Sequence, residues 1–177
     1  MIMSEELGQR YPSGTGRKIG RFELFETQLT TISQYADYGL LPRIDYGKYK
    51  NRKPDALIID RIPDVHPVAV AEYKDIGEIS DSNWESLAYD LVTTKSRPIN
   101  SPIAFLADGA RTYWLNGLSE KVELIRWEDT ERSINKIDFE DAAFISRFEY
   151  LVSYFDAPTS IVKSRQNTNP HKLADEM

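Results

Sequence analysis

Cysteine is absent from this chain of 177 residues, and histidine occurs only twice, as His66 and His171. Without cysteine the protein has no disulfide bond, no thiol catalysis and no metal site built from thiolates. Two histidines are also too few for a zinc site made of histidine ligands. His66 stands between Val65 and Pro67 with no Gly-x-Ser-x-Gly sequence nearby, which argues against a Ser–His–Asp hydrolase.

Long hydrophobic runs are also absent. No stretch approaches 18 consecutive apolar residues, so no membrane-spanning helix is expected. The first residues lack the basic and then apolar run of a secretory signal. The length fits one domain, and the 41% of hydrophobic residues predict a folded core. We therefore expect a soluble, cytoplasmic domain that does not associate with membranes.

The charge of the chain is uneven. A formal net charge of −6 argues against non-specific nucleic-acid binding, but residues 8–21 and 43–53 are strongly basic, while residues 119–157 are acidic. Phosphate binding requires local positive potential more than a positive total. The side chains that we expect to contact DNA are Arg17, Lys18, Lys48, Lys50, Arg52 and Lys53. The alternative is a solvated, lysine-rich loop.

The apolar pattern predicts an α/β fold class, in which helices flank a mixed sheet in an α+β order. Residues 1–20 are rich in glycine and show no periodicity, so we expect an irregular N-terminal arm. In residues 21–38 apolar side chains recur at helical spacing, which predicts a helix. The stripe on this helix consists of Phe22, Phe25, Leu29, Ile32 and Ala36.

Further elements follow along the chain. Strands are predicted at residues 56–60, 68–74, 103–107, 112–115 and 121–127. A second helix begins near Ser82, where Ser82-Asn-Trp-Glu85 matches a capping box, and a third follows Asp138. After Asp156 the apolar pattern stops. We expect residues 21–155 to be the folded domain and residues 156–177 to be a linker or tail that leads to a further domain.

Charged side chains gather near the ends of two neighbouring predicted strands. Pro54-Asp55 begins the first strand, and Glu72-Tyr73-Lys74 ends the next. Side chains two residues apart on a strand point to the same face, so Glu72 and Lys74 project together, roughly 7 Å apart, and Tyr73 points the other way. If the strands pair, Asp55 lies beside Glu72. Two carboxylates beside an ammonium can hold Mg²⁺, which prefers oxygen ligands.

Such a site suits the hydrolysis of phosphodiester bonds. Mg²⁺ lowers the pKa of its bound water and neutralises charge on the phosphate, and Lys74 can orient the attacking hydroxide. The structural alternative is that Asp55 caps a turn and that Glu72 and Lys74 form a salt bridge at the end of a strand. The apolar run from Val68 favours the functional interpretation, because burying a charged pair is costly.

The pattern Pro54-Asp55…Glu72-x-Lys74 resembles the PD-(D/E)xK nuclease motif. More closely, residues 20–155 are similar to the N-terminal nuclease domain of type I restriction endonuclease subunits and related fused restriction–modification proteins. The similarity includes a hairpin that reads Leu-Ala-Asp-Gly-Ala-Arg-Thr-Tyr at residues 106–113. It implies a restriction-endonuclease-like core and a Mg²⁺-dependent endonuclease acting on double-stranded DNA, with Mn²⁺ able to replace Mg²⁺.

The resemblance also implies the roles of individual residues. The catalytic residues would be Asp55, Glu72, Lys74 and Glu26, and the metal ligands would be Asp55, Glu72 and the backbone carbonyl of Tyr73. The family carries a glutamate on its first helix. Glu26 lies about 80° from the centre of the apolar stripe and Glu23 about 140°, so Glu26 can reach the sheet and Glu23 is expected to be solvated.

One motif of the family is altered here. Where the family has Gln-x-x-x-Tyr, this chain has Glu85-Ser-Leu-Ala-Tyr89, so Tyr89 matches and Glu85 departs. The resemblance implies methylase, specificity or ATP-driven motor modules in the same protein or complex, since no Gly-Lys-Ser/Thr loop is present. The alternative function is a catalytically weak or inactive module of the same fold that docks DNA or a partner subunit.

Overall fold

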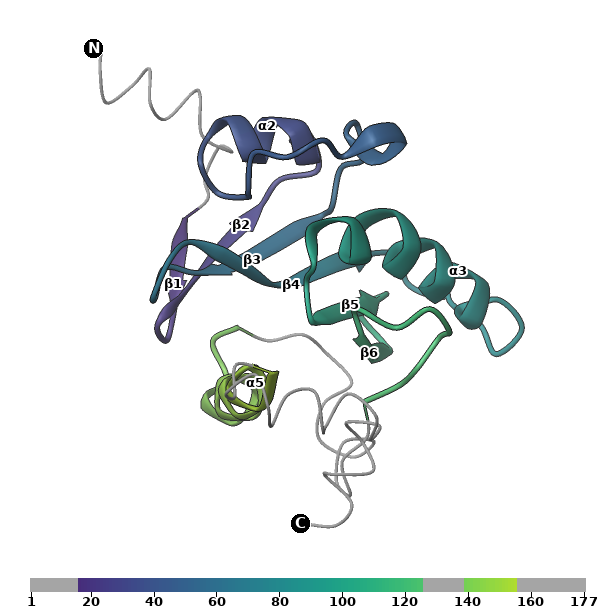
Figure 1. The fold of residues 1–177 in the computed structure, drawn as a ribbon. Helices are drawn as coiled ribbons and strands as arrows, with labels where there is room; N and C mark the ends of the chain where they lie inside the picture. The colour runs from purple at the N-terminus through teal and green to yellow at the C-terminus, as the bar shows by residue number, and fades with distance from the viewer. Residues whose placement is uncertain (1–15, 126–138, 156–177) are drawn as a thin grey trace.

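The structure is a computed structural model that describes residues 16–125 and 139–155 (Figure 1). In this part of the chain the strands are β1 (Arg17–Ile19), β2 (Phe22–Glu26), β3 (Ala56–Asp60), β4 (His66–Tyr73), β5 (Ile103–Ala107) and β6 (Thr112–Asn116). The helices are α2 (Ile32–Asp37), α3 (Trp84–Leu91) and α5 (Ala142–Phe155), with short 3₁₀ turns η1 (Gly47–Tyr49) and η3 (Arg97–Ile99) and a π-helical turn η2 (Val92–Ser96). Among residues 16–125 and 139–155, no helix combines the length and the hydropathy of a membrane span.

The strands form one mixed sheet in the sequence order β1-β2-β3-β4-β5-β6. Neighbouring strands are antiparallel except β4 and β5, which are parallel. A parallel pair needs a long crossover connection, and the segment that contains α3, η2 and η3 supplies it. The mixed sheet with flanking helices confirms the α+β arrangement predicted from the apolar pattern.

Two hydrophobic cores lie on opposite faces of the sheet. In Figure 1 helix α5 covers one face, while α2 and α3 cover the other. Alternate residues of β3 enter the two cores: Ala56 and Ile58 pack with α5, and Leu57 and Ile59 pack with α2 and α3. Because both faces are covered, the central strands are continuous apolar runs.

The helix predicted over residues 21–38 is wrong in its first half, where the chain forms β2. Phe22 and Phe25 pack into opposite cores, because β2 is buried on both faces. Apolar residues three apart in such a strand imitate helical spacing. The helix α2 begins only after Thr31, which is its N-cap in a capping box. Leu29, assigned to the apolar stripe, is instead 78% exposed.

Most of the other predicted elements are confirmed. The strands predicted at 56–60, 68–74, 103–107 and 112–115 correspond to β3, β4, β5 and β6, and the third helix corresponds to α5. The predicted irregular arm is wrong at its end, because Arg17–Ile19 form β1. Within the described part of 121–127, a single bridge joins Leu124 to Leu115. The rest of the arm, the predicted cap Asp138 and the predicted tail 156–177 lie outside the described residues.

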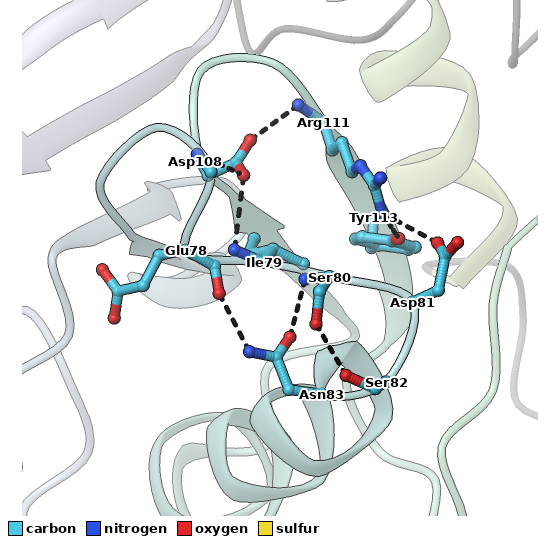
Figure 2. A network of polar contacts seen from close by, with 10 residues as sticks. Glu78, Ile79, Ser80, Asp81, Ser82, Asn83, Asp108, Arg111 and Tyr113 are labelled. Atoms are coloured by element: carbon cyan, nitrogen blue, oxygen red, sulfur yellow. Dashed lines mark hydrogen bonds and ion pairs between the residues drawn. The ribbon is translucent and has the colours of Figure 1, made fainter.

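The second helix is confirmed as α3, but its predicted capping box is wrong (Figure 2). The N-cap is Asn83, whose side chain bonds to the preceding loop: it accepts from the Ser80 N–H over 2.7 Å and donates to the Glu78 carbonyl over 2.9 Å. The Ser82 hydroxyl pairs with the Ser80 hydroxyl at 3.0 Å. Contacts within this loop, rather than Glu85, therefore fix the start of α3.

Candidate active site

Asp55 and Glu72 lie side by side where β3 begins and β4 ends. The Asp55 N–H donates to the Ala71 carbonyl over 3.1 Å, and the Tyr73 N–H donates to Asp55 Oδ2 over 2.7 Å. These bonds continue the contact between the strands beyond the pair Ala56–Ala71, so Asp55 lies against the end of β4 close to Glu72. In a strand, the N–H and C=O of one residue point to the same neighbour, which turns the Tyr73 carbonyl toward Asp55 as well.

Two lysines hold the Glu72 carboxylate. Lys74 Nζ lies 3.5 Å from Glu72 Oε2, and Lys95 Nζ lies 2.6 Å from Glu72 Oε1. Lys74 directly follows β4, whereas Lys95 reaches in from η2. The exposed fractions of the Glu72, Lys74 and Lys95 side chains are 16%, 24% and 12%. Together with Asp55 they form a largely buried group in which two negative charges face two positive ones.

Burial raises the pKa of the Asp55 carboxyl above its ordinary value. The negative charge of Glu72 acts in the same direction, while the Tyr73 N–H and the two lysines oppose the rise. A carboxylate whose charged form is disfavoured is stabilised by a cation placed beside it. The Asp55 carboxyl is thus poised to gain from a further positive charge.

The oxygens at this site fit Mg²⁺. Asp55, Glu72 and the carbonyl of Tyr73 offer hard oxygen donors, and Mg²⁺ keeps several waters, so it needs few protein ligands. In the described part of the chain no three acidic or histidine residues come together as a metal-binding group. The donors present suit a cation that completes its shell with water, and they do not suit a closed site of four side chains.

Glu26 lies on the opposite face of the sheet from Glu72. Glu26 is the last residue of β2, so the prediction that it lies on a helix is wrong. The Tyr73 hydroxyl donates to Glu26 Oε2 over 3.0 Å, and Arg17 Nη2 lies 3.5 Å from Glu26 Oε1. A cavity of ≈ 530 Å³ still brings Glu26 near Asp55. The residues that line it are Glu26, Thr27, Gln28, Leu29, Asp55 and Tyr73.

If the site binds Mg²⁺, we expect Glu26→Gln to leave that affinity within about threefold of the wild type. Glu26 is already paired with Arg17 and Tyr73, and its charge belongs to a partly exposed ion pair. Titration with MgCl₂ in a calorimeter measures this affinity. A loss of about tenfold or more would instead make Glu26 a ligand that acts across the cavity.

Glu23, which the helical wheel assigns to solvent, is buried in β2. Its residue is 9% exposed, Arg61 Nη2 donates to Glu23 Oε1 over 3.1 Å, and Lys18 Nζ lies 3.6 Å from Glu23 Oε2. The hydrogen bond from Arg61 holds the pKa of the Glu23 carboxyl below its ordinary value. The helical wheel failed because the segment is a strand, and Glu23 belongs to an ion-pair group away from the candidate site.

Helix α3 presents Glu85 and Tyr89 to solvent, one turn apart on the same face. Neither residue lines the cavity beside Asp55. The side chain that reaches the site from this direction is Lys95, which belongs to none of the sequence motifs. A signal was present, because Lys95 comes four residues after the buried Leu91 and so continues the buried stripe of the helix.

The two groups of basic candidates lie in different surroundings. Those between α2 and β3 are exposed on the segment that leads into Asp55; they are Lys48, Lys50, Arg52 and Lys53. The carbonyls of Lys50 and Arg52 accept from the first two N–H groups of α2, each over 2.9 Å, which fixes the path of this segment. Arg17 and Lys18 lie on β1, each in an ion pair with a glutamate of β2.

No protein-family model matches the chain, and searches of curated proteins and of solved structures returned no match. The function therefore has to be inferred from the chemistry of the site, where Asp55 and Glu72 meet Lys74 and Lys95.

Proposed function

We propose that this domain is a Mg²⁺-dependent DNA endonuclease of a type I-like restriction–modification system, with a restriction-endonuclease-like core and a place in the cytoplasm. The observation that carries the proposal is the meeting of Asp55, Glu72 and Lys74 at the end of the β3–β4 pair. The strand pair, the helix α3 and the β5–β6 hairpin also follow one another in the order that the resemblance implies.

The residues at this site have separate tasks. Asp55, Glu72 and the carbonyl of Tyr73 would hold Mg²⁺, and Mn²⁺, which shares the preference for oxygen, is expected to replace it. When bound, the cation supplies a water of lowered pKa and neutralises charge on the phosphate. Lys74 is partly exposed, so its ammonium can orient the attacking water and donate to a phosphate oxygen as negative charge builds there. The bond from Tyr73 to Asp55 fixes this carboxylate before the substrate arrives.

The proposed substrate is double-stranded DNA, which would lie over the basic segment 48–53 next to Asp55. The chain has no Gly-Lys-Ser/Thr loop, so ATP-driven translocation must come from another part of the protein or complex. Methylase or specificity modules would likewise be supplied there. The proposal includes the motor, methylase and specificity modules because a restriction nuclease needs them to decide where it cleaves DNA.

A second candidate is a module that docks DNA without cleaving it. The observation that favours it is that both oxygens of Glu72 already face a lysine, so the group is neutral without any cation. In that case Asp55 and Glu72 would stabilise the end of β4, and the basic segment would carry the binding function.

One experiment separates the two candidates. The wild-type protein is titrated with MgCl₂ in a calorimeter in the presence of a DNA duplex, and a supercoiled plasmid is incubated with and without Mg²⁺. Binding of Mg²⁺ together with Mg²⁺-dependent cleavage supports the endonuclease. Absence of Mg²⁺ binding overturns it, and a salt-dependent DNA affinity that survives chelation then supports the docking module.

The basic segment gives a prediction for DNA binding. Replacing Lys50, Arg52 and Lys53 together with glutamine should lower the slope of log affinity against log salt by about 0.9 for each phosphate that the protein no longer neutralises. The measurement is DNA affinity by fluorescence anisotropy at several salt concentrations. Lys18→Gln is the control, because Lys18 is already in an ion pair with Glu23 and should change the slope little. An unchanged slope in the triple variant would mean that DNA binds to another surface of the protein.

A further inference from the structure

Lys95 stands out among the lysines that the structure describes because its ammonium is largely buried against a candidate metal ligand. Its side chain is 12% exposed, and Lys95 Nζ donates to Glu72 Oε1 over 2.6 Å. The ammonium of Lys74 lies further off, 3.5 Å from the other oxygen, and is more exposed at 24%. Burying an ammonium is unfavourable unless it is paired, so Glu72 is the partner that makes the position of Lys95 possible.

The backbone that carries Lys95 is unusual and firmly held. Lys95 lies in η2, the π-helical turn that continues α3, and such turns occur often at functional sites. On either side of it, the Thr94 hydroxyl donates to the Asp90 carbonyl over 2.7 Å, and the buried Ser96 hydroxyl donates to the Ser101 carbonyl over 3.0 Å. Lys95 therefore projects from an anchored turn, and its contact with Glu72 follows from the fold.

Close packing at the end of this turn adds to the anchoring. A Cβ on Gly117 would meet the Ser101 carbonyl oxygen at 2.1 Å and Ser96 Oγ at 2.3 Å. Only glycine therefore lets the chain after β6 pass so near to the segment that follows Lys95. The turn that carries Lys95 is thus packed closely against the chain after β6.

Charge balance shows what this lysine does. In the described structure the ammoniums of Lys95 and Lys74 balance the carboxylates of Glu72 and Asp55. A divalent cation bound by these carboxylates would add two positive charges to a group that is already neutral. Lys95 Nζ also donates to Glu72 Oε1, one of the carboxylate oxygens that would ligate a cation. Repulsion between the cation and the two ammoniums opposes metal binding, and so does competition between the cation and Lys95 for Oε1.

We propose that Lys95 is a tethered cation that holds Glu72 in place of the divalent metal, so that metal binding requires Lys95 to leave Glu72 Oε1. This inference rests on the proposed function for its metal site. A DNA phosphate beside the site offers the released ammonium a new partner. The phosphate and the metal then favour each other's binding. Both require Lys95 to separate from Glu72, and whichever binds first has already broken that ion pair. Lys95 is thus a positioning residue that couples metal binding to the presence of DNA.

The test is the affinity for Mg²⁺ alone, measured by calorimetry with MgCl₂ on the full chain. Lys95→Met keeps all but the last atom of the side-chain length and removes the charge, and it should bind Mg²⁺ on the order of tenfold more tightly than the wild type. Lys74→Met is the matched control, because it removes an equal charge from the same carboxylate at a longer distance, and it should give a smaller gain. A merely structural role for Lys95 would weaken binding or leave it unchanged.

The outcomes are distinguishable. If the wild type binds Mg²⁺ and Lys95→Met binds it no more tightly, this inference is overturned while the proposed function stands. An equal gain in Lys74→Met also overturns it, since the effect would then belong to charge in general. If neither the wild type nor Lys95→Met binds Mg²⁺, the proposed function fails and the inference with it. Should Lys95→Met not fold, Lys95→Gln keeps a hydrogen-bond donor without the charge and decides in the same way.

Discussion

If the domain is the proposed endonuclease, Asp55→Asn should reduce Mg²⁺-dependent DNA cleavage by at least about 100-fold, because it removes the charge of a proposed metal ligand. Even the loss of a residue that only supports a ligand costs roughly 10- to 100-fold. The fold should survive, since the amide oxygen of asparagine can still accept the hydrogen bond from the Tyr73 N–H. Plasmid cleavage and calorimetric titration with MgCl₂ measure the two losses. Cleavage by Asp55→Asn at the wild-type rate would show that Asp55 is not part of the active site.

The same substitution should make the protein slightly more stable, by up to about 1 kcal/mol at neutral pH in the absence of metal. Burial raises the pKa of Asp55 above its ordinary value of 3.8, so the folded state binds the proton more tightly than the unfolded state does. The tighter binding of this proton to Asp55 adds to the free energy of unfolding of the wild type at low pH. That contribution is lost as the pH rises through the pKa of Asp55 in the folded state. Asparagine does not ionise, so the variant keeps that stability.

A matched control separates this effect from a general effect of removing charge. Asp64→Asn makes the same change on the exposed loop between β3 and β4 and should leave unfolding by urea within about 0.5 kcal/mol of the wild type. Added Mg²⁺ should then raise the stability of the wild type and of Asp64→Asn but not that of Asp55→Asn. A stabilisation of Asp55→Asn by Mg²⁺ equal to that of the wild type would contradict the assignment of Asp55 as a ligand.

The proximity of Asp55 and Glu72 could be predicted because it depends only on the pairing of two neighbouring strands. The runs that became β3 and β4 are apolar, short and joined by a proline-containing turn, so their pairing follows from local signals. Once they pair, the alternation of side chains places Glu72 and Lys74 on one face and Tyr73 on the other. Nothing from distant parts of the chain is needed for that step.

Glu26 and Lys95 could not be placed in this way, because their positions depend on the packing of whole layers. A strand that is buried on both faces has apolar residues at spacings that suit a helix equally well, so Glu26 was assigned to the wrong kind of element. Lys95 is brought to Glu72 by a π-helical turn, which has no reliable sequence signal. Its only trace in the sequence is a lysine that continues a buried stripe.

Asp108→Asn is expected to destabilise the protein by about 2–4 kcal/mol, because Asp108 is a buried carboxylate that accepts hydrogen bonds from two segments. The residue is 3% exposed. Its Oδ1 accepts from the N–H groups of Ala110 and Arg111, over 3.0 and 2.8 Å. Its Oδ2 accepts from those of Gly77 and Ile79, over 3.3 and 3.4 Å. Figure 2 shows this side chain between the β5–β6 turn and the loop before α3.

Asparagine cannot replace this carboxylate because it has one oxygen and one amino group. Whichever way the amide turns, its NH₂ faces backbone N–H groups that then lack an acceptor, and each buried donor left in this state costs about 1–3 kcal/mol. Urea unfolding measures the loss. Asp81→Asn is the matched control: Asp81 pairs with Arg111 at 2.9 Å, but its side chain is 95% exposed, so the change should stay within about 0.5 kcal/mol.

The pH dependence of stability gives a second, independent test of the role of the Asp108 charge. Burial alone would raise the pKa of this carboxyl, but the N–H groups of Arg111, Ala110, Ile79 and Gly77 outweigh it and hold the pKa below the ordinary value of 3.8. The stability that Asp108 provides is therefore complete above that pH and is lost as the pH falls through the folded pKa. The difference between the wild type and Asp108→Asn should shrink in acid. A constant difference would mean that the charge of Asp108 is not what holds the loop after Lys74 in place.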